Sequence, residues 1–143
     1  MTVDKKYTCP CCGYKVFDSE PGSYEICPIC FWEDDNSQLR YPMEKGANSV
    51  SLAEAQINYM TQGVSAPELK IFVRPPAEDE KKDSGWRMLD TTKDKIEIKI
   101  DDERKVTVYP TDMTKLYYWE DDFWLKDDCQ ISLDNSRKPE EEV

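Results

Sequence analysis

The sequence predicts an α+β protein in which a small cysteine-rich region with one helix is followed by a small antiparallel β-sheet. Three observations predict it: two C-x-x-C turns near the amino terminus, a capped helical pattern after them, and alternating apolar residues in the second half. The expected organisation is a cysteine-rich domain over residues 1–75, a polar linker over 76–84 and an antiparallel β region over 85–143.

The two cysteine turns are Cys9-Pro-Cys-Cys12 and Cys27-Pro-Ile-Cys30. Two residues between cysteines let a tight turn aim both sulfurs at one point, and two such turns supply the four thiolates of a tetrahedral site. The sequence therefore predicts a knuckle of rubredoxin-like or zinc-ribbon type holding one structural Zn²⁺. Its predicted ligands are Cys9, Cys12, Cys27 and Cys30. A rubredoxin-like iron site uses similar turns and is kept as an alternative.

The two turns differ in the residue that follows them, and two further cysteines lie outside the predicted ligand set. Gly13 supplies the left-handed conformation that closes the first turn, whereas Phe31 stands at the corresponding position of the second. Cys11 is expected to be either a thiol beside the site or an alternate ligand. Cys129 has no partner in the sequence and is expected to be an ordinary half-buried cysteine.

A short helix is predicted over residues 52–62. Ser51 is a plausible N-cap, Glu54 three residues later completes a capping box, and Gly63 stands where a helix-ending glycine belongs. The apolar stripe of this helix consists of Leu52, Ala55 and Tyr59. We expect that stripe to cover the metal-bearing turns.

The second half is predicted to form strands. Strict alternation over residues 95–100, repeated at Val106 and Val108, predicts a hairpin over 95–109. A second hairpin is predicted from residues 116–119 and 123–125, and residues 86–89 and 131–133 are candidate edge strands. One face of such a sheet is apolar and needs a cover.

Several segments in the first half resemble one known family. They are Cys9-Pro-Cys-Cys-Gly-Tyr14, the stretch from Gly22 to Asp35, the stretch from Gly46 to Gln56, and Val73-Arg-Pro-Pro76. Together they resemble the bacterial cysteine-rich CPCC proteins over about residues 7–76. The resemblance implies a small zinc-binding domain and no particular activity.

The composition excludes several functions. A net charge of −11 opposes binding to nucleic acid and to anionic membranes. The chain has no histidine, the commonest general base, and four thiolates leave a zinc ion no open position, so we expect no enzyme. Residues 1–8 do not form a signal peptide, and no apolar run approaches the length of a membrane span, so a cytoplasmic location is expected.

The remaining interpretation is a protein-binding protein. Aromatic residues beside carboxylates are typical of binding surfaces, and an acidic surface favours a basic partner. The predicted partner-binding residues are Trp119, Glu120, Asp121, Asp122 and Trp124. By analogy of size and charge, an immunity protein that neutralises a basic toxin domain is the specific hypothesis. A rubredoxin-like iron electron carrier is the alternative.

Overall fold

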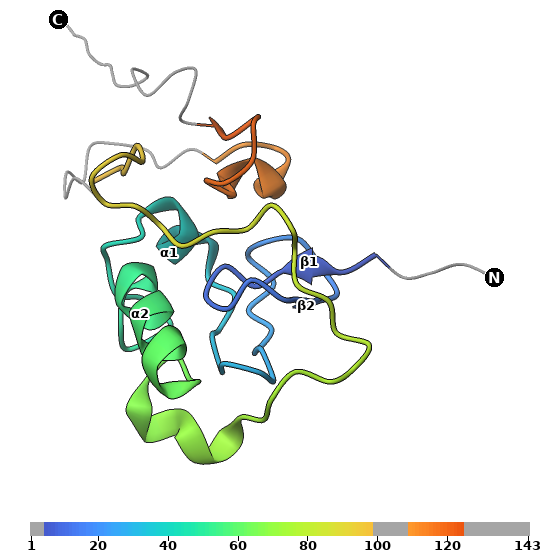
Figure 1. The fold of residues 1–143 in the computed structure, drawn as a ribbon. Coiled ribbons are helices and arrows are strands. Elements are labelled where there is room, and N and C mark those ends of the chain that lie inside the picture. Colours follow the sequence, from blue (N-terminus) through green and yellow to red (C-terminus); the bar gives the residue numbers. More distant parts are fainter. Residues whose placement is uncertain (1–4, 99–108, 125–143) are drawn as a thin grey trace, which may run out of the picture.

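The computed structural model describes residues 5–98 and 109–124 (Figure 1). Its regular elements are short and are joined by turns and irregular chain. They are strands β1 (Tyr7–Thr8) and β2 (Lys15–Phe17), helices α1 (Asn36–Arg40) and α2 (Leu52–Gln62), and the 3₁₀ helices η1 (Pro67–Phe72) and η2 (Met113–Leu116).

Strands β1 and β2 form an antiparallel pair on either side of the first cysteine turn. Tyr7 is paired with Phe17 and Thr8 with Lys15. A later segment runs beside this pair, because the Lys15 amide donates to the Lys81 carbonyl at 2.9 Å and the Asp83 amide donates to the Gly13 carbonyl at 2.8 Å. The chain just after the cysteine-rich half is therefore fixed against the first turn.

The structure confirms the predicted helix as α2. The Ser51 hydroxyl accepts a hydrogen bond from the Glu54 amide, and Gly63 ends the helix in the left-handed conformation. Leu52 and Ala55 are completely buried, so the predicted apolar stripe faces the core.

Helix α1 has no counterpart in the prediction. Its N-cap is Asp35, whose carboxylate accepts from the Ser37 amide at 2.9 Å. Five residues are too few to show a helical period, so only the capping aspartate marked its start.

The predicted strands of the second half are not found where the structure describes that half. Residues 86–89, 95–98 and 117–119 form no strand. The first strand of the second predicted hairpin was expected to begin at residue 116, but Leu116 is the last residue of η2. Leu116, Tyr117 and Tyr118 are buried in succession, which a strand with one apolar face does not allow. Most of the hairpin predicted over 95–109, and the edge over 131–133, lie outside the described residues.

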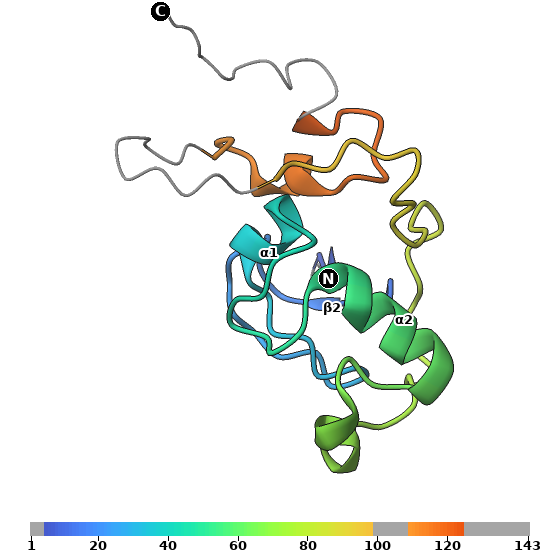
Figure 2. The ribbon, with the colours of Figure 1, turned by 90° about the vertical axis from the view of Figure 1, so that its left-hand side faces the viewer.

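One hydrophobic core joins the described parts of both halves. It gathers residues of the cysteine turns with Phe17, Trp32 and Leu52, and it also includes Leu116 and Tyr117. The Tyr117 hydroxyl donates to the Thr8 carbonyl at 3.1 Å, across 109 positions of sequence. Figure 2 shows η2 lying against α1, in agreement with the contacts between them.

The described residues thus show few helices and a two-stranded antiparallel sheet, which agrees with the predicted α+β class only in outline. This arrangement does not establish a rubredoxin-like fold. Within the described ranges, no helix has the length and apolar character needed to cross a membrane.

Candidate metal centre

The structure brings the four predicted ligands together. All four sulfurs lie within 4.8 Å of one another, with 3.6 Å between the Sγ atoms of Cys9 and Cys30 and 3.7 Å between those of Cys12 and Cys27. Four sulfurs at about 2.3 Å from one ion would be separated by about 3.8 Å in a regular tetrahedron. A disulfide would require about 2.05 Å, so these thiols are free. The four cysteines can therefore hold one metal ion.

The two cysteine turns, which we call the first and second knuckles, have the same backbone pattern. The Gly13 amide donates to the Cys9 carbonyl, and the Phe31 amide donates to the Cys27 carbonyl, both at 2.8 Å. Gly13 has φ 85° and Phe31 has φ 68°. Phe31 thus takes the left-handed conformation despite its side chain, at a cost of about 1–2 kcal/mol relative to a right-handed one.

The first knuckle requires glycine for a second reason. A Cβ on Gly13 would lie 2.7 Å from two atoms of the Trp86 ring, because the indole packs directly against the glycine. The indole Nε1 also donates to the Pro10 carbonyl at 2.9 Å. Trp86 therefore covers the tip of the first knuckle.

Helix α2 covers the knuckles from another side, as predicted. Gln56 donates from Nε2 to the Pro10 carbonyl at 2.9 Å. The Cys11 thiol donates to the Ala55 carbonyl, with 3.4 Å between sulfur and oxygen. Cys11 is thus a buried thiol directed at the helix and is not one of the four clustered sulfurs.

The cluster is closed to solvent. All four cysteines are 0% exposed, and burial raises the pKa of the Cys9 and Cys30 thiols. Burial also opposes ionisation of Cys27, but hydrogen bonds from Cys12 and the other thiols outweigh it and lower the pKa of Cys27. The thiols can therefore stabilise a thiolate at one position, and a bound divalent cation would favour deprotonation of all four.

Asn48 is a buried residue that the sequence did not single out as part of the site. Its side-chain amide accepts from the Glu33 backbone amide at 2.8 Å and donates to the Glu33 carbonyl at 2.9 Å. These two bonds are the ones that the backbone of a paired β-strand would make. Gln38 in turn accepts from Asn48. These amides support the second knuckle from outside, and their only sequence signal was the position of Asn48 within a segment that carried the family resemblance.

Asp34 is a buried carboxyl close to the second knuckle. It is 3% exposed and accepts a 2.6 Å hydrogen bond from the Ser23 hydroxyl. Burial raises the pKa of Asp34 from 3.8 to about 6, although the Ser23 hydrogen bonds oppose this shift. The unfolded chain loses this proton near pH 4 and the folded protein near pH 6, so Asp34 lowers stability as pH rises across that window.

Replacing Asp34 by Asn is therefore expected to stabilise the protein at neutral pH, by about 1–2 kcal/mol. The advantage over wild type should shrink at pH 5, as urea unfolding of both proteins would show. Asp35→Asn is the matched control. Burial opposes ionisation of Asp35, but donation from the Ala47 and Ser37 amides outweighs it and holds the pKa of Asp35 below its usual value. That change should destabilise at neutral pH, and equal effects of the two changes would contradict the prediction.

The predicted partner-binding residues divide into two groups. Trp119 is half-buried, stacks on Tyr117 with 4.6 Å between ring centroids, and donates from Nε1 to Asp83. The Arg40 guanidinium lies over the Trp124 ring, 4.7 Å from the centroid of that ring. The second group, Glu120, Asp121 and Asp122, is exposed, with Asp122 paired to Lys115 at 3.0 Å. Cys129 lies outside the described residues.

A fold of short elements around four buried, clustered thiols defines a cysteine-knuckle protein with a candidate metal centre. A family model described as "Cysteine-rich CPCC" matches residues 7–80, which is more than half of the chain. The chain therefore belongs to the cysteine-rich CPCC family, and the resemblance in the sequence is confirmed. A search of curated proteins found no match.

Proposed function

We propose that the four cysteines bind one structural zinc ion and that the scaffold so formed acts, without catalysis, by binding another protein. The observation that carries the zinc proposal is the complete burial of four sulfurs at tetrahedral spacing. Four thiolates would leave no coordination position for a substrate or for water, which a catalytic zinc requires. A reducing compartment such as the bacterial cytoplasm would keep these thiols available to the metal.

The identity of the bound metal distinguishes the proposed structural zinc site from a rubredoxin-like iron site. Protein produced with zinc and iron supplied equally is expected to contain one zinc ion per chain and to be colourless. Elemental analysis and a visible absorption spectrum would measure this. A red product with a reversible one-electron couple would instead support a rubredoxin-like electron carrier.

A basic protein is the partner that the charge supports. The net charge of −11 would attract a cationic protein, and Glu120, Asp121 and Asp122 extend from the surface. Trp119 and Trp124 make contacts within the chain, so their replacement should affect folding as well as binding. A basic toxin domain, neutralised by an immunity protein, is the specific partner proposed.

The double replacement of Asp121 and Asp122 by Lys is expected to slow association with that partner by roughly tenfold and to change dissociation less, because charge acts mainly on the encounter. Surface plasmon resonance with a partner captured from host lysate, at low and at raised salt, would measure both rates. Glu78→Lys together with Asp79→Lys is the control with the same change in charge in another exposed segment. Failure to capture any basic protein at low salt with the metal retained would remove support for the partner.

A further inference from the structure

The two knuckles differ in what covers their tips. Trp86 packs against Gly13 on the first knuckle, within van der Waals reach of the backbone. On the second knuckle the corresponding position carries the side chain of Phe31, which is only partly buried. Its ring meets Phe72 of η1, with 5.3 Å between ring centroids and an angle of 33°.

Phe31 occupies a backbone conformation that disfavours any residue with a side chain. Phe31 has φ 68°, a conformation that glycine adopts without steric strain, as Gly13 does at the equivalent position of the first knuckle. No indole like that of Trp86 rests on this tip among the described residues, and Phe72 itself remains 58% exposed. Backbone strain held at a partly exposed aromatic residue points to a role for that side chain beyond folding.

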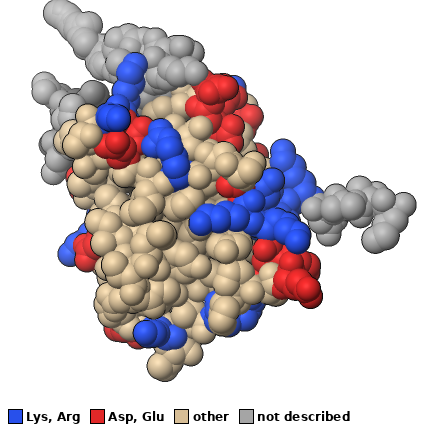
Figure 3. All heavy atoms as spheres, in the orientation of Figure 1, with Lys and Arg blue, Asp and Glu red and all other residues tan. Residues whose placement is uncertain are grey.

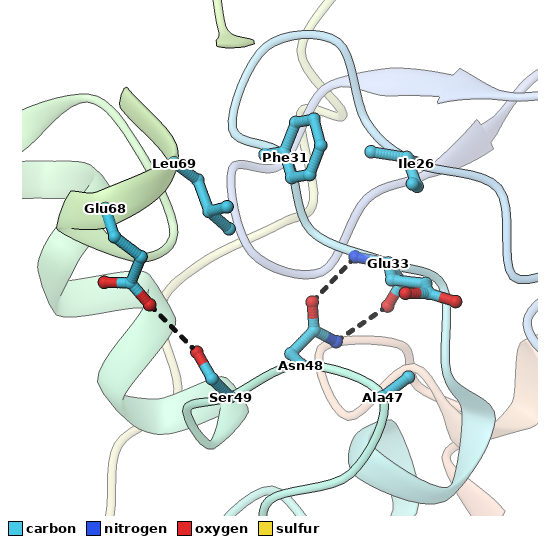
Figure 4. A pocket seen from close by; sticks show the side chains of 8 residues that line it. All are labelled: Ile26, Phe31, Glu33, Ala47, Asn48, Ser49, Glu68 and Leu69. Carbon is cyan, nitrogen blue, oxygen red and sulfur yellow. Dashed lines mark hydrogen bonds between the residues drawn. The ribbon is translucent and has the colours of Figure 1, made fainter. Parts of the chain in front are cut away.

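A pocket of about 310 Å³ lies beside this ring. Figure 4 shows Phe31 and Ile26 facing Asn48 and Ser49 across it, with the carboxylates of Glu68 and Glu33 near opposite ends. Ile26 is 47% exposed, so the apolar wall is accessible. Among the residues that the structure describes, no lysine or arginine lines the pocket. Arg74, two residues after Phe72, is paired with Glu80.

The apolar surface continues around η1. Ile71 is 85% exposed. In Figure 3 the middle of the lower part of the face shown is mostly uncharged, and charged side chains lie along its lower margin. In Figures 1 and 2, η1 lies at the end of the molecule opposite to residues 113–124. This surface is therefore separate from the acidic residues 120–122.

We infer that the pocket beside Phe31 binds a short segment of another protein that combines an apolar side chain with neighbouring lysine or arginine residues. The apolar side chain would lie against Phe31 and Ile26, which form the apolar wall of the pocket. The cations would pair with Glu33 and Glu68. A second copy of this chain is disfavoured as occupant, because its net charge of −11 would repel the first. The inference rests on the proposed protein-binding function and assigns it a site.

The test is a titration of the full, metal-loaded chain with the capped peptide Lys-Lys-Phe-Lys-Lys, followed by NMR. The backbone amide signals of Asn48, Ser49 and Leu69 should move, whereas those of residues 120–122 should change less. Lys-Lys-Ser-Lys-Lys and Glu-Glu-Phe-Glu-Glu are the control peptides, and each should bind at least about fivefold more weakly. Equal shifts with the serine peptide, or shifts confined to residues 120–122, would overturn the inference.

Two variants separate binding from folding. Phe31→Gly removes the ring and relieves the strained backbone, so it should leave the unfolding midpoint close to wild type. It should weaken binding of the Lys-Lys-Phe-Lys-Lys peptide at least about fivefold. Ile26→Ala should weaken binding of that peptide similarly, because Ile26 lines the same pocket. Ile57→Ala is the matched control, because Ile57 is 56% exposed on α2 and is absent from the pocket lining. Unchanged peptide affinity in Phe31→Gly would overturn the inference.

Failure of the pocket proposal can be distinguished from failure of the proposed protein-binding function. Capture of a host protein that binds Phe31→Gly and Ile26→Ala as tightly as wild type would support protein binding and contradict this site. A peptide titration that behaves as expected, with no host protein captured, would support the site's chemistry while leaving the basic partner without support.

Discussion

Replacing Cys30 by Ser is expected to abolish stable metal binding and to unfold the cysteine-rich half. A structural zinc contributes about 10–16 kcal/mol of apparent binding free energy in small domains, which equals or exceeds the stability of most domains. The described part of the second half should be lost as well, because Tyr117 donates to the Thr8 carbonyl and Leu116 belongs to the same core. Metal analysis, circular dichroism and tryptophan fluorescence would measure this loss, and a strong chelator should reproduce it in the wild-type protein.

Cys11 provides a matched control for that experiment. It lies in the same turn as Cys9 and Cys12 and is equally buried, but its thiol donates to the Ala55 carbonyl. Cys11→Ala is therefore expected to keep the metal and to lose only about 1 kcal/mol of stability. Loss of the metal in Cys11→Ala, with its retention in Cys30→Ser, would show that the ligand set is wrong.

Replacing Gly13 by Ala is expected to destabilise the metal-loaded protein by about 3 kcal/mol. The new methyl group would lie 2.7 Å from the Trp86 ring, and the residue would have to keep φ near 85°. Relief by moving the indole would break its hydrogen bond to the Pro10 carbonyl. Urea unfolding with zinc in excess would measure the loss.

The reverse change at the second knuckle is the control for Gly13. Phe31→Gly places a residue without a side chain at the same backbone conformation, φ 68°, and should stay within about 1 kcal/mol of wild type. If both changes destabilise equally, packing by Trp86 is not what distinguishes the two tips.

The sequence was sufficient for features that depend on neighbouring residues. The spacing of each cysteine pair identifies the four clustered sulfurs, because two intervening residues already form the turn that aims them. Ser51 and Gly63 set the ends of α2 for the same reason, since each cap bonds to backbone within four residues. The family resemblance likewise rested on short motifs in a fixed order, and the family model matches residues 7–80.

The described parts of the second half could not be predicted in this way. Residues 116–119 and 123–125 predicted a hairpin, but Leu116, Tyr117 and Tyr118 are all buried because they pack against the cysteine-rich half. An apolar pattern over four residues fits a strand or a turn equally well, so distant packing decides between them. The Thr114 amide donates a capping hydrogen bond to the Asp112 carboxylate, which favours η2.

The sequence by itself determined the four sulfurs and the helix beside them, because turns and caps are governed by local backbone chemistry. Only the tertiary structure decided that Trp86 covers one knuckle while Phe31 stays accessible on the other, since the contact from Trp86 to Gly13 spans more than 70 positions. The same holds for Tyr117 and Thr8. Such contacts form when distant segments share a core, and nothing in either segment alone specifies the other.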